Sequence, residues 1–136
     1  MFEAFADPAI TSQFWFTRGS GRLEPGARVR WHWDMYGVAS DAVVTAFEKD
    51  RHITIDWLSD TAQTSVDWRF SARADGTTFV DIVQSGFAGD ADAIAAQALA
   101  STEGFTLVLA GLKALLEHGV RLNLVADRFP DGAGRD

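Results

Sequence analysis

The sequence has 136 residues, of which 47% are hydrophobic and 12% aromatic, and it carries a formal net charge of −7 at pH 7 with no cysteine. That length suits one domain that buries roughly two-thirds of the surface its unfolded chain would expose. The negative charge argues against nucleic acid and anionic membranes as partners, because phosphate binding needs a positive surface. The lack of cysteine excludes disulfides, thiolate metal sites and a thiol nucleophile.

Two short helices are predicted at the start of the chain. Asp7 can cap a helix and Pro8 suits its first position, so the second helix should run from there toward Trp15. The glycine-bearing stretch that follows contains a Glu-Pro-Gly turn, which predicts a hairpin entering the first long strand.

Five strand-like runs come next, at the spacing of an antiparallel meander. They are Ala27–Tyr36, Asp41–Phe47, His52–Leu58, Thr64–Ala72 and Thr77–Ser85. Apolar and polar residues alternate along them, which predicts one apolar and one polar face. The apolar face collects Val29, Trp31, Trp33, Met35, Ile53, Ile55, Trp57, Val66, Trp68, Phe70, Val80, Ile82 and Gln84. The polar face collects Arg28, Arg30, His32, Asp34, His52, Thr54, Asp56, Ser65, Asp67, Arg69, Ser71 and Asp81.

An amphipathic helix is predicted after the strands. Its apolar positions recur with helical spacing, at Phe105, Val108, Leu109, Leu112, Leu115 and Leu116. Ser101 or Thr102 is expected to cap this helix after an alanine-rich helical stretch, and Gly119 to follow its end. The helix should cover the apolar face of the sheet, since each element must bury its apolar side. We expect a single domain, 1–136, with a core of about 1–120 and a frayed tail at 121–136.

The stretch RVRWHWDMYG, residues 28–37, concentrates residue types that could form a site. His32 and Asp34 could offer two metal ligands, but a metal needs a third and usually a fourth. Ion pairs such as Asp67 with Arg69 are the favoured interpretation of this polar face, and no metal site is predicted. The arginines and tryptophans of the stretch point to opposite faces of the strand. Nucleic-acid bases could therefore not stack on the same face that holds the phosphates, which argues against a nucleic-acid site.

Catalytic motifs are not visible in the sequence. No serine lies in a nucleophile-elbow setting, and no glycine-rich phosphate loop leads into a helix. His118 falls at a helix end, where a cation is favoured by the helix dipole. We therefore predict no catalytic residue and no cofactor, and leave open whether the protein is an enzyme.

Three residues allow two interpretations each. Gln84 lies on the apolar face, where its amide needs a partner; this is nearby backbone in a solid core, or a ligand's polar group in a cavity. Trp15 and Tyr36 are either core residues or the lip of a pocket.

Several strings, taken in order, resemble the SRPBCC/START-like superfamily and its heat shock protein 90 ATPase-activator-like branch of polyketide cyclase/dehydrase-like proteins. They are FEAFADPAITSQFWF, LEPGARVRWHW, ADGTTFVDIVQSGFAGD, STEGFTLVLAGLKALLEHG and LNLVADRFPD. The resemblance implies an α+β helix-grip fold, in which a curved antiparallel sheet wraps around a long C-terminal helix beside two short N-terminal helices. Members usually begin with a strand that has no counterpart here, so the sheet has an exposed edge, the start is misassigned, or a partner strand completes it.

The same resemblance implies a cavity between sheet and helix, used by relatives for lipids, hormones or polyketide-like molecules. We expect this chain to bind a small hydrophobic molecule there, as a cytoplasmic monomer or weak dimer without a membrane span. The alternatives are a cyclase or aromatase-type enzyme and a chaperone-ATPase-activator-like interaction module. The expected pocket residues are Trp15, Trp31, Trp33, Trp57, Trp68, Phe70, Ile82, Gln84, Phe105, Leu109 and Leu112, with Trp15 as a gate.

Overall fold

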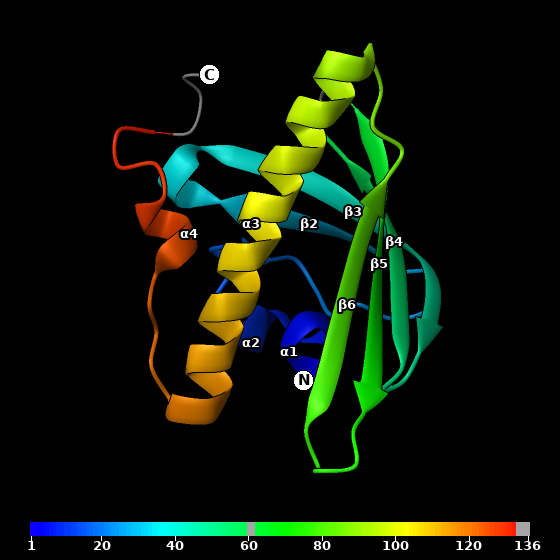
Figure 1. The fold of residues 1–136 in the computed structure, drawn as a ribbon, viewed down its shortest axis with the longest axis vertical. Coiled ribbons are helices and arrows are strands. Elements are labelled where there is room, and N and C mark those ends of the chain that lie inside the picture. The colour runs from blue at the N-terminus through cyan, green and yellow to red at the C-terminus, as the bar shows by residue number, and fades with distance from the viewer. Residues whose placement is uncertain (60–61, 133–136) are drawn as a thin grey trace.

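Six antiparallel strands form one sheet, and a long helix lies along its inner face (Figure 1). The computed structural model describes residues 1–59 and 62–132. The strands are β1 (Arg18–Gly19), β2 (Arg28–Trp33), β3 (Val38–Glu48), β4 (His52–Leu58), β5 (Gln63–Ala72) and β6 (Thr78–Ser85). The helices are α1 (Phe2–Ala6), α2 (Pro8–Thr11), the 3-10 turn η1 (Asp34–Tyr36), α3 (Ala91–His118) and α4 (Leu124–Asp127). The helix-grip prediction is confirmed.

Every strand pairs with its neighbour in the chain, in the order β1-β2-β3-β4-β5-β6. The sheet begins after α2 with β1, which is only two residues long and pairs with β2. At the opposite edge β6 pairs with β5 alone, within the residues that the structure describes.

The predicted start of α2 is confirmed. The Asp7 carboxylate accepts a hydrogen bond from the backbone N–H of Ala9 at 2.9 Å, and Pro8 takes the first helical position. α2 is shorter than expected, because it ends at Thr11. The Thr11 hydroxyl donates to the backbone carbonyl of Ala4 at 2.5 Å, which ties α2 to α1.

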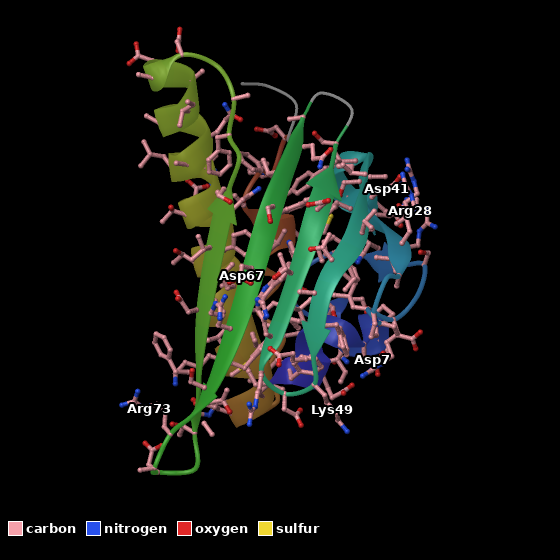
Figure 2. The ribbon with its side chains drawn as sticks, turned by 90° about the vertical axis from the view of Figure 1, so that its right-hand side faces the viewer. Asp7, Arg28, Asp41, Lys49, Asp67 and Arg73 are labelled. Carbon is pink, nitrogen blue, oxygen red and sulfur yellow. The ribbon has the colours of Figure 1, made fainter. Side chains whose placement is uncertain are left out.

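The predicted alternation of faces is confirmed along the strands. In β2 the arginines are exposed while Val29, Trp31 and Trp33 are buried. Figure 2 shows the polar face, with Asp67 near its middle. One residue was placed wrongly: Met35 is 40% exposed, because β2 ends at Trp33 and the chain turns through η1.

The long helix starts 11 residues before the start that a cap at Ser101 predicts. Asp90, not Ser101 or Thr102, is its N-cap, and the Asp90 carboxylate accepts a hydrogen bond from the Ala93 backbone N–H at 2.8 Å. Alanine has the highest helix propensity, so the alanine-rich stretch continues without interruption into the apolar part of the helix. The predicted end is confirmed, since Gly119 adopts a left-handed conformation with φ 66°.

By length and composition α3 could cross a membrane, although core helices of soluble proteins pass the same test. Only 22% of its most apolar window is buried in this fold. Val108 and Leu112 are buried in the core, and Phe105, Leu109 and Leu115 pack against it.

The prediction that the segment after residue 120 leaves the domain is wrong. It folds back beside α3, where α4 forms (Figure 1). The Tyr36 hydroxyl donates to the backbone carbonyl of Val125 and lies 3.1 Å from that of Ala126. Arg128 forms an ion pair with Glu103 on α3. Tyr36 thus anchors this segment, and residues 133–136 of the expected tail lie outside the described residues.

Candidate ligand site between the sheet and α3

A stacked pair of tryptophans forms one wall of the space between sheet and helix. The rings of Trp33 on β2 and Trp57 on β4 have centroids 6.1 Å apart and planes inclined by 23°. The Trp57 indole N–H donates to the hydroxyl of Ser40 at 2.6 Å. Ser40 lies on β3, between the two strands, and is 5% exposed. This bond satisfies the indole and fixes the orientation of its ring.

An open cleft of about 390 Å³, called the cavity below, adjoins this pair. It is lined by Trp33, Val38, Ala39, Ser40, Trp57, Ser59, Ala62, Thr64, Gln84, Phe87, Gln97, Ala100 and Ser101. All of the polar side chains in this lining are hydroxyls or amides. Among the residues that the structure describes, the cavity therefore offers aromatic surface and neutral hydrogen-bonding groups, without a charged side chain.

A hydrogen-bonded bridge crosses from the sheet to the helix at one side of the cavity. The Gln84 amide nitrogen donates to the Thr64 hydroxyl at 2.8 Å, and the Ser101 hydroxyl donates to the Gln84 amide oxygen at 2.5 Å. The backbone partner predicted for Gln84 in a solid core is wrong, since the amide bonds to side chains, whereas a ligand contact of Gln84 in a cavity stays a prediction. The bridge connects β5, β6 and α3.

A second space lies beyond this bridge, between β6 and α3. This groove has a volume of about 400 Å³. It is lined by Val80, Asp81, Ile82, Val83, Gln84, Phe87, Ala98, Ser101, Thr102, Phe105, Thr106 and Leu109. Gln84, Phe87 and Ser101 line both spaces, so the bridge stands between them.

The predicted pocket residues separate into groups. Trp33, Trp57 and Gln84 line the cavity, and Ile82, Phe105 and Leu109 line the groove beside Gln84. Trp31, Trp68, Phe70 and Leu112 are buried core residues that line neither space.

Trp15 packs into the core and also lines two small pockets outside the cavity and the groove, so its role as a gate stays a prediction. It is 7% exposed, and its ring lies 5.1 Å from Trp31, 5.6 Å from Phe105 and 5.7 Å from Trp57, measured between centroids. Such aromatic pairs stabilise a core beyond their buried area. Trp15 joins the sheet to α3.

Several cavity residues were not among those predicted, and one of them had a signal in the sequence. Ser40, Ala42 and Val44 alternate along β3 on the buried face. Extending the predicted strand from Asp41 back to Val38 would have placed Ser40 beside the tryptophans. Ser59 and Gln97 carry no such periodic signal.

The polar face holds a separate cluster around Asp67. The Asp67 carboxylate accepts hydrogen bonds from the hydroxyl of Thr54 at 2.7 Å and from Arg69 at 2.9 Å, and it also contacts His52. Burial by itself would raise the pKa of Asp67, but the hydrogen bonds from Thr54 and His52 hold that pKa below its ordinary value of 3.8. Within the described part of the chain, no three His, Cys, Asp or Glu residues lie close enough to hold a metal ion.

This cluster predicts an acid-dependent loss of stability. A carboxylate whose folded pKa is lowered stabilises the fold above its unfolded pKa, and that contribution disappears as pH falls through the folded pKa. We expect wild type to lose more free energy of unfolding than Asp67→Asn between about pH 5 and pH 2. Urea unfolding at a series of pH values measures the difference. Parallel stability curves for the two proteins would contradict this role for Asp67.

Comparison with known proteins places this arrangement among relatives. Residues 1–117 match the family described as Activator of Hsp90 ATPase homolog 1-like protein. The solved structure of SSP2350 from Staphylococcus saprophyticus is 28% identical, with a TM-score of 0.75 over 89% of this chain and 84% of its own. No curated protein matches the chain.

Two more distant structures share the fold. DynU16, from the dynemicin biosynthetic locus, is 19% identical, with a TM-score of 0.69 over 88% of this chain and 43% of its own. CalU16 from Micromonospora echinospora is 16% identical, with a TM-score of 0.58 over 79% of this chain and 63% of its own.

Proposed function

Because the chain belongs to the Activator of Hsp90 ATPase homolog 1-like family, we propose that it uses the space between sheet and helix to bind an uncharged hydrophobic small molecule. The observation that carries this proposal is the cavity beside Trp33 and Trp57, which combines a stacked aromatic wall with neutral polar groups. Its volume of about 390 Å³ is within the range of small-molecule sites, roughly 300–1,000 Å³.

The lining favours a neutral ligand over an ionised one. A carboxylate brought into this cavity would give up water and find no cationic side chain among the described lining residues, and burying an unpaired charge is costly. A hydroxyl or carbonyl group can instead exchange hydrogen bonds with Gln84, Thr64 or Ser101. A flat aromatic body would pack against Trp57, which is only partly buried.

The cyclase alternative has less support at this site. Proton transfer to a bound substrate needs a titratable group within hydrogen-bond reach. None of the lining residues within 1–59 and 62–132 is His, Asp, Glu, Lys or Tyr. Binding is therefore the function that the lining favours.

The experiment compares two ligands of the same shape and different charge. We expect 2-naphthol to bind and to shift tryptophan fluorescence, while 2-naphthoate binds at least about tenfold more weakly because its charge is unpaired. Trp57→Leu should weaken 2-naphthol binding by about tenfold, measured by calorimetry, since it removes part of the aromatic wall.

Leu99→Ala is the matched control, because Leu99 lies on α3 with 72% of its surface exposed and lines neither space. This variant should bind 2-naphthol as wild type does. Equal affinity for the naphthol and the naphthoate would overturn the neutral-ligand proposal. Unchanged 2-naphthol binding in Trp57→Leu, or no 2-naphthol binding by wild type, would contradict the proposed site.

A further inference from the structure

The C-terminal segment borders one of the two small pockets that Trp15 lines, on the side of α3 away from β6 (Figure 1). This open space, called the side pocket below, has a volume of about 270 Å³ and lies between α3 and the residues around α4. Its described lining shares only Ala100 with that of the cavity and no residue with that of the groove. The side pocket is therefore a separate candidate site.

Tyr36 fixes the segment that forms one wall of the side pocket. Its hydroxyl donates to the backbone carbonyl of Val125 and accepts a hydrogen bond from the backbone N–H of Phe129 at 3.3 Å. The rings of Tyr36 and Phe129 meet edge to face, with centroids 5.8 Å apart. All three residues line the side pocket, so the contacts that hold this wall also give the pocket its shape.

Gly104 widens the opposite wall, on α3. Glycine inside a helix is unfavourable relative to alanine, so such a glycine needs a reason. Gly111, on the same helix, is buried and lies close to Phe14. At Gly104, apart from its chain neighbours and the adjoining helix backbone, no described atom lies within 4 Å of the place that an added Cβ would take. The packing of the described residues does not require glycine there, whereas an open side pocket does.

The interior of the side pocket is apolar and aromatic. Trp15 lines it from the core, Leu107 and Val108 line it from α3, and Phe129 lines it from the C-terminal segment. A phenyl or large aliphatic group can pack against these side chains and leave water. The volume is slightly below the range of roughly 300–1,000 Å³ for ordinary small-molecule sites, so the ligand should be about as small as one amino acid.

Two side chains of opposite charge, Glu103 and Arg128, are the only charged ones in the described lining. They form an ion pair, and their side chains are 49% and 42% exposed. The hydrogen bond from Arg128 holds the pKa of Glu103 below its ordinary value, so the carboxylate is ionised at neutral pH. Exposed pairs of this kind contribute little to stability, so a ligand can separate them at small cost.

We propose that the side pocket binds a free α-amino acid with a large apolar side chain, such as phenylalanine. The ligand's ammonium group would pair with Glu103, its carboxylate would pair with Arg128, and its side chain would occupy the apolar interior.

The two charges favour a zwitterion over a ligand with a single charge. An amine would pair with Glu103 but would lie near the guanidinium of Arg128, and like charges repel. A carboxylic acid would pair with Arg128 but would lie near the carboxylate of Glu103. An amino acid gives each of these side chains a partner in place of the ion pair that it separates.

Calorimetry with three ligands of similar shape tests the charge requirement. The probes are L-phenylalanine, phenethylamine, which lacks the carboxylate, and 3-phenylpropionate, which lacks the ammonium group. We expect phenylalanine to bind at least about fivefold more tightly than either analogue, because each analogue leaves one charged side chain without a ligand partner. Glu103→Gln should remove the advantage of phenylalanine over 3-phenylpropionate. This ratio of affinities does not depend on the stability of the variant.

Gly104→Leu tests the position of the site. The added side chain should fill the pocket from α3 and weaken phenylalanine binding by at least about tenfold. Leucine also has a higher helix propensity than glycine, so α3 should remain formed, as circular dichroism would show. Ala110→Leu is the matched control, because Ala110 is exposed on the same helix and does not line the side pocket. This control should bind phenylalanine as wild type does.

Trp57→Leu separates this site from the cavity. It should leave phenylalanine binding unchanged while it weakens 2-naphthol binding, so the two proposals can fail independently. Weaker phenylalanine binding in Trp57→Leu would place the amino acid in the cavity and overturn the proposal. No phenylalanine binding by wild type, equal affinity for the three ligands, or unchanged binding in Gly104→Leu would also overturn it.

Discussion

Trp15→Ala should lower the free energy of unfolding by about 3–5 kcal/mol, the range for removing a large buried aromatic side chain. The ring of Trp15 lies within 6.2 Å of those of Trp31, Trp57, Trp68 and Phe105, measured between centroids. Removing the Trp15 ring would leave a cavity among these aromatic neighbours, which the surrounding structure fills only in part. Urea unfolding, followed by circular dichroism, measures the loss.

Leu99→Ala serves as the control here too, because an exposed substitution normally changes stability by less than about 0.5 kcal/mol. Trp15→Phe should lie between the two variants, since it keeps an aromatic ring at the centre of the cluster. A gate would behave differently: Trp15→Ala would keep its stability and bind ligands faster. That result would support the gate predicted from the sequence.

Gln84→Met should lower the free energy of unfolding by about 1–2 kcal/mol. It removes two hydrogen bonds and leaves the hydroxyls of Thr64 and Ser101 without their partner. Methionine is similar in size to glutamine, so the change tests the amide rather than the volume. The largest effect should fall on the N-terminal half of α3, where residues 91–100 contain no buried side chain. We expect amide exchange there to become several-fold faster.

Gln97→Met is the matched control. Its amide donates to the backbone carbonyls of Ala88 and Ala93, at 2.8 and 3.0 Å, and so bonds within α3 and the segment leading to it. Gln97→Met should lower the free energy of unfolding less than Gln84→Met does. It should also leave amide hydrogen exchange in the rest of α3 unchanged. If Gln84→Met matches wild type in stability and exchange, the bridge does not hold α3 on the sheet.

The sequence was sufficient to predict the sheet and its two faces. Strand periodicity is a local property, and a two-residue repeat assigns each side chain to a face without knowledge of the rest of the fold. Trp33 and Trp57 were therefore placed correctly on the inner face. Met35 was misplaced because the two-residue repeat continues to it in the sequence, whereas the chain turns through η1.

The extent of the cavity could not be predicted in the same way. Strand periodicity predicts which side chains point inward. The position of α3 decides which of those side chains line a cavity and which are packed against other atoms. Trp31 and Trp68 are packed against other rings, whereas Trp57 and Gln84 border a cavity. The start of α3 was missed because Ser101 resembles a cap, although its hydroxyl bonds to Gln84.

The strictly sequential strand order has a consequence for how the chain acquires its structure. Each strand can pair with the strand synthesised just before it, through a short hairpin connection. The entropic cost of loop closure during assembly of the sheet is therefore small. The contacts with the largest sequence separation come last, when α3 and then the segment held by Tyr36 reach residues about 90 positions earlier. A ribosome-bound chain would therefore carry a nearly complete sheet whose inner aromatic surface is still uncovered, and that late stage is where misassembly would concentrate.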